Sequence, residues 1–339
     1  MISRRAFLAG LTTLTADALV RAAEAQLAAA SAQPDVHILD TAVAPLRPTR
    51  NTAPRIMLMA VVGGLGAAFA LAILLDLIDR RFRYPDQATT ELGLVIAGAI
   101  PRLPKGGVDT SSPDQVSQLV EAFRSLRMHV AQASQVPFCV AVTSPSPGDG
   151  KSLVSANLAL SFAEAGYRTV LVDGDTRRGA LQEMFSIPRS PGLTEYLLGQ
   201  SDIEDVIYPT SHARLSLVPC GRRQQRSPEL LASSALPQLI KLLRDGYDVV
   251  VFDTPPLAAG IDAYAISAAA SKMLIVLRIG QTERRMAAAK LQIADRLPIE
   301  VLGAVLNGVK LEGEYQYYGY SVGYALAEPE TGTEVVQTG

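Results

Sequence analysis

The chain has few of the residues that build metal and redox centres. Its 339 residues include two cysteines, Cys139 and Cys220, and three histidines, His37, His129 and His212. The cysteines are far apart in sequence and the histidines are scattered, so neither a metal centre nor a redox pair is expected from them. A formal net charge of −2 leaves no overall basic field that would recruit nucleic acid.

Hydrophobic residues are abundant instead, at 48% of the chain, which indicates contact with lipid. The run from Ile56 to Leu75 contains 20 residues without a charge, the length needed to cross the hydrocarbon core. Soluble helices of this length rarely lack a polar face, so the pattern predicts a transmembrane helix over 56–78 in preference to a buried core helix. Small residues at 63, 64, 67 and 68 either permit close helix approach or reflect only the high Gly and Ala content.

The segment before this run, 1–55, has two interpretations. The stretch "SRRAFLAGL" resembles a twin-arginine export signal. Asp17, Arg21 and Glu24 weaken the apolar region of such a signal and favour the end of a periplasmic helix from a longer protein. Arginines flank the apolar run on both sides, so they do not orient it. Either interpretation places residues up to about 55 outside the cytoplasm, with a proline-rich approach to the membrane.

The remainder of the chain alternates apolar strands with helical patterns. Residues 79–117 contain four prolines and are predicted to form an irregular juxtamembrane linker. From 118 to 312, helical patterns separate strand candidates such as "FCVAVTS", "RTVLVDGD", "YDVVVFDTPP" and "KMLIVLRIG". Unbroken Val and Ile runs indicate strands covered on both faces. The expected fold is therefore α/β, with a mostly parallel sheet flanked by helices.

The stretch "SPSPGDGKS", 144–152, is a phosphate-binding candidate between a predicted strand and a predicted helix. It differs from the usual G-x-x-x-x-G-K-[ST] because Pro145 replaces the first glycine. Glycines let the backbone N–H groups turn toward phosphate, and the helix N-terminus adds positive charge. Lys151 would reach the β/γ-phosphates and Ser152 would ligate Mg²⁺. A Gly/Pro turn before a helix is the alternative. The predicted nucleotide-binding residues are Pro147, Gly148, Asp149, Gly150, Lys151, Ser152 and Leu153.

Three carboxylates favour the nucleotide-binding interpretation. Asp173 and Asp175 end one apolar strand and Asp253 ends another. The carboxyl ends of parallel strands gather along one edge of a sheet, where ligands bind, so all three are expected near the P-loop. A Mg²⁺–triphosphate needs such carboxylates, directly or through water.

These motifs together resemble the bacterial tyrosine kinases, P-loop NTPases related to the MinD/ParA ATPases. "SPSPGDGKS", "VLVDGDTRRG" and "VVVFDTPP" are similar to the family's Walker A, A′ and B motifs, and the resemblance covers about residues 34–325. The signature lysine of the partitioning ATPases would fall at Ser146, which argues against that branch. The resemblance implies that Asp173 helps hold Mg²⁺ and accepts the tyrosine proton, with Asp175 beside it. It also implies that Asp253 completes the Mg²⁺ site and that Asn307 contacts the base.

Two further features carry expectations about assembly and substrate. "EAFRSLR" matches the family's E-x-x-R-x-x-R subunit-contact pattern at Glu121, Arg124 and Arg127, although spacing alone favours a solvated helix face. The tail, 313–339, concentrates five of the 11 tyrosines of the chain. It is predicted to be phosphorylated in trans, and a packed aromatic strand or interface is the alternative. The predicted phosphoacceptors are Tyr315, Tyr317, Tyr318, Tyr320 and Tyr324.

The resemblance thus implies an ATP- and Mg²⁺-dependent tyrosine autokinase that regulates exopolysaccharide or capsule polymerisation and export. Its expected setting is the bacterial inner membrane, with the kinase domain in the cytoplasm. The expected partners are a ring-like homo-oligomer, the membrane, the polysaccharide machinery and a cognate tyrosine phosphatase, without nucleic acid. Two alternatives remain open: a membrane-anchored MinD/ParA-type ATPase, and a non-catalytic nucleotide-binding regulator of polysaccharide export.

Overall fold

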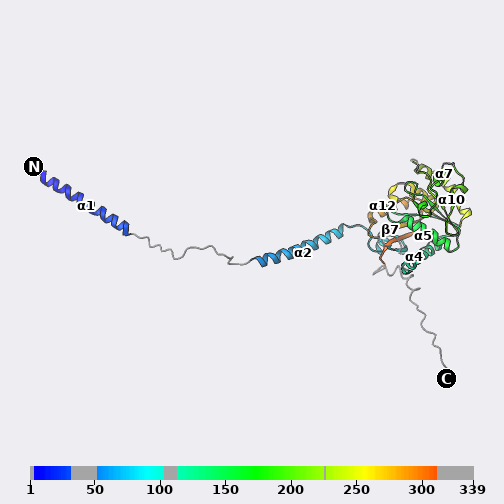
Figure 1. Ribbon diagram of the computed structural model, residues 1–339, viewed down its shortest axis with the longest axis horizontal. Coiled ribbons are helices and arrows are strands. Elements are labelled where there is room, and N and C mark those ends of the chain that lie inside the picture. The colour runs from blue at the N-terminus through cyan, green and yellow to red at the C-terminus, as the bar shows by residue number, and fades with distance from the viewer. Residues whose placement is uncertain (1–3, 32–51, 103–112, 225–226, 311–339) are drawn as a thin grey trace, which may run out of the picture. The chain divides into compact units, whose positions relative to one another are not determined.

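The structure of the chain is a computed structural model that describes residues 4–31, 52–102, 113–224 and 227–310 (Figure 1). The chain divides into two compact units, Met1–Ile73 and Leu74–Gly339. The first unit contains helix α1 (Arg4–Ser31) and most of helix α2 (Ala53–Ile78). The helical state of α1 is compatible with both interpretations of the N-terminal segment.

Helix α2 contains the uncharged run, and it begins at Ala53, slightly before the run itself. Within the described residues it is the one helix long and apolar enough to cross a membrane. None of its side chains is buried, and large apolar ones such as Leu58 and Phe69 are exposed along its length. This exposure is not that of a buried core helix, and it fits a helix whose apolar surface meets lipid.

The second unit is built on an eight-stranded sheet with the order β1-β8-β7-β2-β6-β3-β5-β4. Every neighbouring pair is parallel except β4 with β5. The predicted mostly parallel α/β sheet is therefore confirmed. The strands are β1 (Ile96–Pro101), β2 (Phe138–Thr143), β3 (Thr169–Asp173), β4 (Tyr208–Pro209), β5 (Leu215–Val218), β6 (Val249–Asp253), β7 (Lys272–Arg278) and β8 (Glu300–Val309).

Helices cover both faces of this sheet because both faces of its central strands are apolar. Every residue of β2, β3 and β6 is buried. Alternate side chains of β2 enter two different cores, with Val140 facing the helix that holds Phe162 and Ala141 facing the helix that holds Leu239. The helices are α3 (Asp86–Leu92), α4 (Pro113–Gln132), α5 (Lys151–Glu164), α6 (Leu181–Met184), α7 (Leu193–Leu197), α8 (Ile203–Val206), α9 (Ser227–Leu231), α10 (Ala235–Gly246), η1 (Leu257–Ala259), α11 (Asp262–Ala270) and α12 (Arg284–Ala294).

Two helices, α4 and α5, pack on one face with the residues of the first core. The opposite face is covered by α9, α10 and α11 over one half of the sheet and by α3, α11 and α12 over the other. This three-layer arrangement brings the carboxyl ends of the parallel strands to one edge, where the loops that follow them meet.

The segment after α2 differs from its prediction as an irregular linker. Residues 86–101 form α3 and β1, and β1 pairs in parallel with β8 at the edge of the sheet. Phe82 is fully buried, and its N–H donates to the carbonyl of Thr282 at 3.0 Å. The residues that follow α2 are therefore an integral part of the folded unit.

Candidate nucleotide site

The P-loop turns from β2 into α5 through two glycines with positive φ. Gly148 has a φ of 85° and Gly150 a φ of 92°. Residues that carry a Cβ rarely adopt such positive φ values. A Cβ at Gly150 would lie 2.0 Å from the Nδ2 atom of Asn307. Helix α5 begins at Lys151, as predicted. Both glycines are thus required by the backbone, and Gly150 also by the close approach of Asn307.

Two side chains orient the peptide groups of the loop. Arg278 Nη1 donates to the carbonyl of Gly148, and Asn307 Nδ2 donates to the carbonyl of Asp149, both at 2.8 Å. In a planar trans peptide the C=O and the following N–H point in opposite directions. Fixing these two carbonyls on the protein side turns the N–H groups of residues 149 and 150 away from it. Those groups, with the first N–H groups of α5, form an anion-binding cradle.

Asp149 organises the same loop from within. Its carboxylate accepts the N–H of Ser146 at 2.9 Å and the hydroxyl of Thr282 at 2.8 Å. Burial raises the pKa of Asp149 to about 6, while the bonds from Thr282 and Ser146 and the charge of Arg278 act in the opposite direction. The side chain thus fastens the loop to the turn that follows β7.

The three predicted carboxylates meet at this loop. Asp173 and Asp253 are direct register partners at the ends of β3 and β6. Lys151 Nζ lies 3.2 Å from Asp175 Oδ2 and 3.7 Å from Asp253 Oδ2. All three carboxylates are buried, and Ser155 Oγ donates to Asp253 at 3.1 Å. Parallel pairing has therefore gathered carboxylates from the ends of two strands around one lysine at the start of α5.

Burial and the neighbouring charges shift the pKa values of the groups in this cluster. Burial, followed by the negative charge of Asp253, raises the pKa of Asp173 to about 7. Burial also raises the pKa of Asp253, against the opposing influence of Lys151. Burial lowers the pKa of Lys151, but the charges of Asp253 and Asp175 outweigh it and the net direction is upward. The lysine is therefore held as a cation, and the site gains stability from any further positive charge near the carboxylates.

A cleft of about 380 Å³ opens beside the cluster. Its walls come from the P-loop, from the residues after β3 and from the loop after β6. The lining residues are Pro147, Gly148, Lys151, Asp175, Arg177, Arg178, Pro255, Pro256 and Ala259. Backbone groups of the P-loop, a lysine and two arginines thus surround one opening together with Asp175, an arrangement suited to an anionic ligand.

The donor set also fits a hard divalent cation. Ser152, Asp173 and Asp253 supply a hydroxyl and two carboxylates, and Mg²⁺ in phosphate sites is held by one or two carboxylates with phosphate oxygens and water. Among the described residues no group of three or more His, Cys, Asp or Glu side chains is arranged as a cage for a metal ion.

Some predicted residues are not brought to this site. Glu121 and Arg124 of α4 form an ion pair on the surface, while Arg127 donates to the carbonyl of Ser161 at 2.7 Å and ties α4 to α5. The three do not form a uniform solvated face, because Arg127 is partly buried. The tyrosines at 315, 317, 318, 320 and 324 lie outside the described residues.

Sequence reasoning missed several residues that build the site, and four of them make the main contacts. Arg278 and Thr282 hold the P-loop, Ser155 holds Asp253, and Arg177 lines the cleft. Arg177 follows the "VDGD" motif by two positions, and Arg278 ends an apolar strand that was recognised. Position near a predicted strand end was therefore the available signal for Arg177, Arg278 and Thr282, although it does not tell which loop each one meets, and Ser155 within α5 gave no such signal.

Removing the hydroxyl of Thr282 should weaken nucleotide binding. In Thr282→Val, Asp149 loses one of its two hydrogen bonds while it stays buried, so the loop is less well fixed. We expect ATP affinity to fall about 5-fold, equivalent to about 1 kcal/mol. Isothermal titration with ATP measures this. Thr90→Val is the matched control, since that exposed hydroxyl bonds only within its own helix. Equal ATP affinity in wild type and Thr282→Val would contradict the role assigned to this hydrogen bond.

Fold and site together define a P-loop nucleotide-binding protein. A model of the family described as "AAA domain" matches residues 139–286. The chain is 34% identical to the tyrosine-protein kinase YwqD of Bacillus subtilis over 203 residues, which are 59% of this chain and 86% of that protein. It is 29% identical to the tyrosine-protein kinase ptk of Acinetobacter johnsonii, over 81% of this chain and 40% of that protein.

A solved structure agrees with these relatives. The kinase domain of the Escherichia coli tyrosine kinase ETK superposes with a TM-score of 0.60 at 28% identity, over 68% of this chain and 96% of that one. The chain belongs to the bacterial tyrosine-kinase family. It covers most of the length of the Bacillus relative but less than half of the Acinetobacter relative.

Proposed function

We propose that this chain is a protein-tyrosine autokinase that uses ATP and Mg²⁺ and phosphorylates its own C-terminal tyrosines in trans. The observation that carries the proposal is the placement of Lys151 among Asp173, Asp175 and Asp253 beside a phosphate-binding loop. Membership of the tyrosine-kinase family supports it. Five tyrosines between 315 and 324 supply an acceptor segment within the same chain.

The reaction moves the γ-phosphoryl group of ATP to a phenolic oxygen. The bond from the γ-phosphorus to the oxygen that bridges to the β-phosphate breaks, the bond to the tyrosine oxygen forms, and ADP leaves with the bridging electrons. The phenolic proton passes to a base. Asp173 is the candidate base, as the family resemblance implies. Because the phenol has a pKa of about 10, far above that of a carboxylate, Mg²⁺ or a nearby cation such as Lys151 must help the tyrosine to ionise.

The other residues of the site would bind the nucleotide and its metal ion and neutralise the charge of the phosphates. Lys151 and the N–H groups of the P-loop would hold the phosphates, and Asn307 would contact the base of the nucleotide. Ser152, Asp173 and Asp253 would hold Mg²⁺, which supplies charge neutralisation for the phosphates. Asp175 lies against the lysine and keeps it charged. Catalysis is then mainly positioning and electrostatics, as in other P-loop transfers.

The setting proposed for this activity is the inner membrane of a bacterium. Helix α2 would cross the bilayer, and the P-loop unit would lie in the cytoplasm, where ATP is available. Glu121, Arg124 and Arg127 are proposed to contact a neighbouring copy in a ring that presents each tail to the next site. The family resemblance extends the proposal to control of polysaccharide polymerisation and export, with reversal by a tyrosine phosphatase.

A mixing experiment tests transfer between copies. The donor is the full chain with the five tail tyrosines changed to phenylalanine, and the acceptor is the full chain with Lys151→Met and an intact tail. With ATP and Mg²⁺ we expect phosphotyrosine on the acceptor tail, mapped by mass spectrometry to residues 315–324. ATP hydrolysis without any phosphotyrosine would favour the membrane-anchored ATPase, and ATP binding without turnover would favour the non-catalytic regulator.

A further inference from the structure

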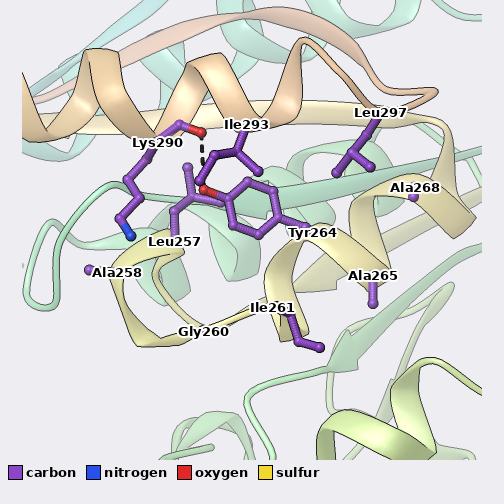
Figure 2. A pocket seen from close by; sticks show the side chains of 10 residues that line it. All are labelled: Leu257, Ala258, Gly260, Ile261, Tyr264, Ala265, Ala268, Lys290, Ile293 and Leu297. Atoms are coloured by element: carbon purple, nitrogen blue, oxygen red, sulfur yellow. Dashed lines mark hydrogen bonds between the residues drawn. The ribbon is translucent and has the colours of Figure 1, made fainter.

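A second hollow lies beside the cleft, on the far side of the loop that follows β6. It has a volume of about 470 Å³ and runs between α12 and the segment formed by η1 and α11 (Figure 2). Figure 2 shows Ile293 of α12 and Leu297, from the turn after that helix, opposite Leu257 and Tyr264. We call this hollow the flanking groove. Its size is that of a site for a side chain or a small ligand, roughly 300 to 1,000 Å³.

The flanking groove is lined mainly by apolar side chains. The tyrosine hydroxyl among its lining residues has a hydrogen-bond partner. Tyr264 is 7% exposed, and its hydroxyl donates to the carbonyl of Lys290 at 3.0 Å. Ile261 and Ile293 are large apolar residues that remain 62% and 44% exposed at its margin. Such a surface gains free energy from covering by an apolar or aromatic group rather than by a charged one.

One short loop forms a wall of both the cleft and the groove. Pro255, Pro256 and Ala259 face the cleft, while Leu257 and Ala258 face the groove. Arg177 fixes this loop: its Nη1 donates to the carbonyl of Ala259 at 3.0 Å, and its Nε donates to Asp262 Oδ2 at 3.0 Å. A peptide that leaves the cleft over this wall therefore passes directly to the groove.

The occupant is indicated by the composition of the chain after β8. Residues 311–339 contain five tyrosines and five glutamates but no lysine or arginine. One cation, Lys290, lines the groove, and at its edge beside Gly260 lies the guanidinium of Arg177, which is paired with Asp262. In the segment "GEYQYYGY", Glu314 stands immediately before the first tyrosine. Aromatic rings match the apolar lining, and a glutamate of the tail matches the charge of Lys290.

We propose that the flanking groove docks a tyrosine ring of the tail of a second copy while a neighbouring tyrosine occupies the cleft. Tyrosines two or three positions apart, such as Tyr315 with Tyr317 or Tyr317 with Tyr320, lie about 7 to 10 Å apart in an extended peptide. That spacing lets one ring anchor the segment as the next is phosphorylated. The clustering of the tyrosines is then a docking requirement as well as a supply of acceptors.

This inference rests on the proposed function, and its test uses binding as well as transfer. The substrate is a synthetic peptide with the sequence of residues 313–326, and the enzyme is the full chain in detergent. In Ile293→Glu a carboxylate enters the groove, at a position exposed enough to accept it. We expect both the dissociation constant of the fluorescein-labelled peptide and the KM for peptide phosphorylation to rise about 10-fold, with the KM for ATP unchanged.

Gln292→Glu, which adds the same charge to the exposed neighbour on α12 outside the groove, should leave all three values unchanged. Ala268→Phe fills the groove without adding charge and should also weaken the peptide, which separates blocking from repulsion. Unchanged peptide binding in both groove variants overturns the proposal. It is also overturned if these variants alter only the oligomeric state measured by light scattering, since the groove is then a subunit contact.

The two proposals fail in different ways. If the wild-type chain transfers no phosphate to any tyrosine but still binds the peptide in a manner that Ile293→Glu weakens, the kinase proposal fails and the groove proposal stands. If transfer to the tail is robust and independent of both groove variants, the kinase proposal stands and the groove proposal fails.

Discussion

Lys151→Met is expected to reduce phosphotyrosine formation by at least about 100-fold. The lysine is the one cation within 4 Å of Asp175 and Asp253 among the described ion pairs, and it stands at the start of α5 where phosphates would bind. Loss of a single preorganised charge or donor at a reacting centre commonly costs about 100- to 1,000-fold in rate. The measurement is incorporation of labelled phosphate from ATP into the full chain, read with a phosphotyrosine antibody.

The substitution also leaves buried carboxylates without their cation, so the fold needs its own control. Lys151→Arg keeps the positive charge but replaces the compact ammonium with a planar guanidinium. This variant should keep the fold and lose most of the phosphoryl transfer. Lys241→Met, at an exposed position of α10, should behave as wild type in both assays. Phosphotyrosine at the wild-type level in folded Lys151→Met would falsify the role given to this lysine.

The sequence predicted the central part of the fold because its strands are apolar throughout. β2, β3 and β6 are buried at every residue, so their Val and Ile runs carry an unambiguous signal. The convergence of Asp173 and Asp253 follows from the same fact, because parallel strands end at one edge. The motifs at the strand ends therefore predicted those site residues whose positions follow from the strand ends alone.

The edge of the sheet could not be read in the same way. β1, "IAGAIP", is rich in small residues and ends in proline, and it lies in a segment punctuated by prolines. Its strand state comes from pairing with β8, some 200 residues later in the chain. Strand propensity depends on such partners more than on local composition. The local sequence of such a segment predicts an irregular linker, and the segment becomes a strand because it pairs with a neighbouring strand.

The supports of the P-loop were missed for a related reason. Arg278 and Thr282 contact the loop because β7 lies next to β2 in the sheet. The order of the strands is a property of the whole fold, and no local pattern states which strand end will meet which loop. The backbone carbonyl of Pro145, which stands in place of the first P-loop glycine, accepts the N–H of Ala258 and fastens the loop to the segment after β6.

Asp173 is expected to make the stability of the metal-free protein depend on pH. Burial and the charge of Asp253 raise the pKa of Asp173 from 3.8 to about 7, so the folded state binds its proton more tightly than the unfolded state does. The resulting stabilisation is complete below the unfolded pKa and is lost as pH rises through the folded one. In Asp173→Asn this contribution is absent at every pH.

We therefore expect the free energy of unfolding of the wild type, relative to Asp173→Asn, to fall by about 3 kcal/mol between pH 4.5 and pH 8. The measurement is urea unfolding of the full chain in detergent with EDTA and without nucleotide. Asp295→Asn, which removes an exposed carboxylate at the end of α12, should follow the wild type at both pH values. Adding ATP and Mg²⁺ should reduce the difference, because a cation beside Asp173 favours its ionised form. Parallel stability curves for wild type and Asp173→Asn in EDTA would show that Asp173 is ionised throughout and that burial does not control its proton affinity.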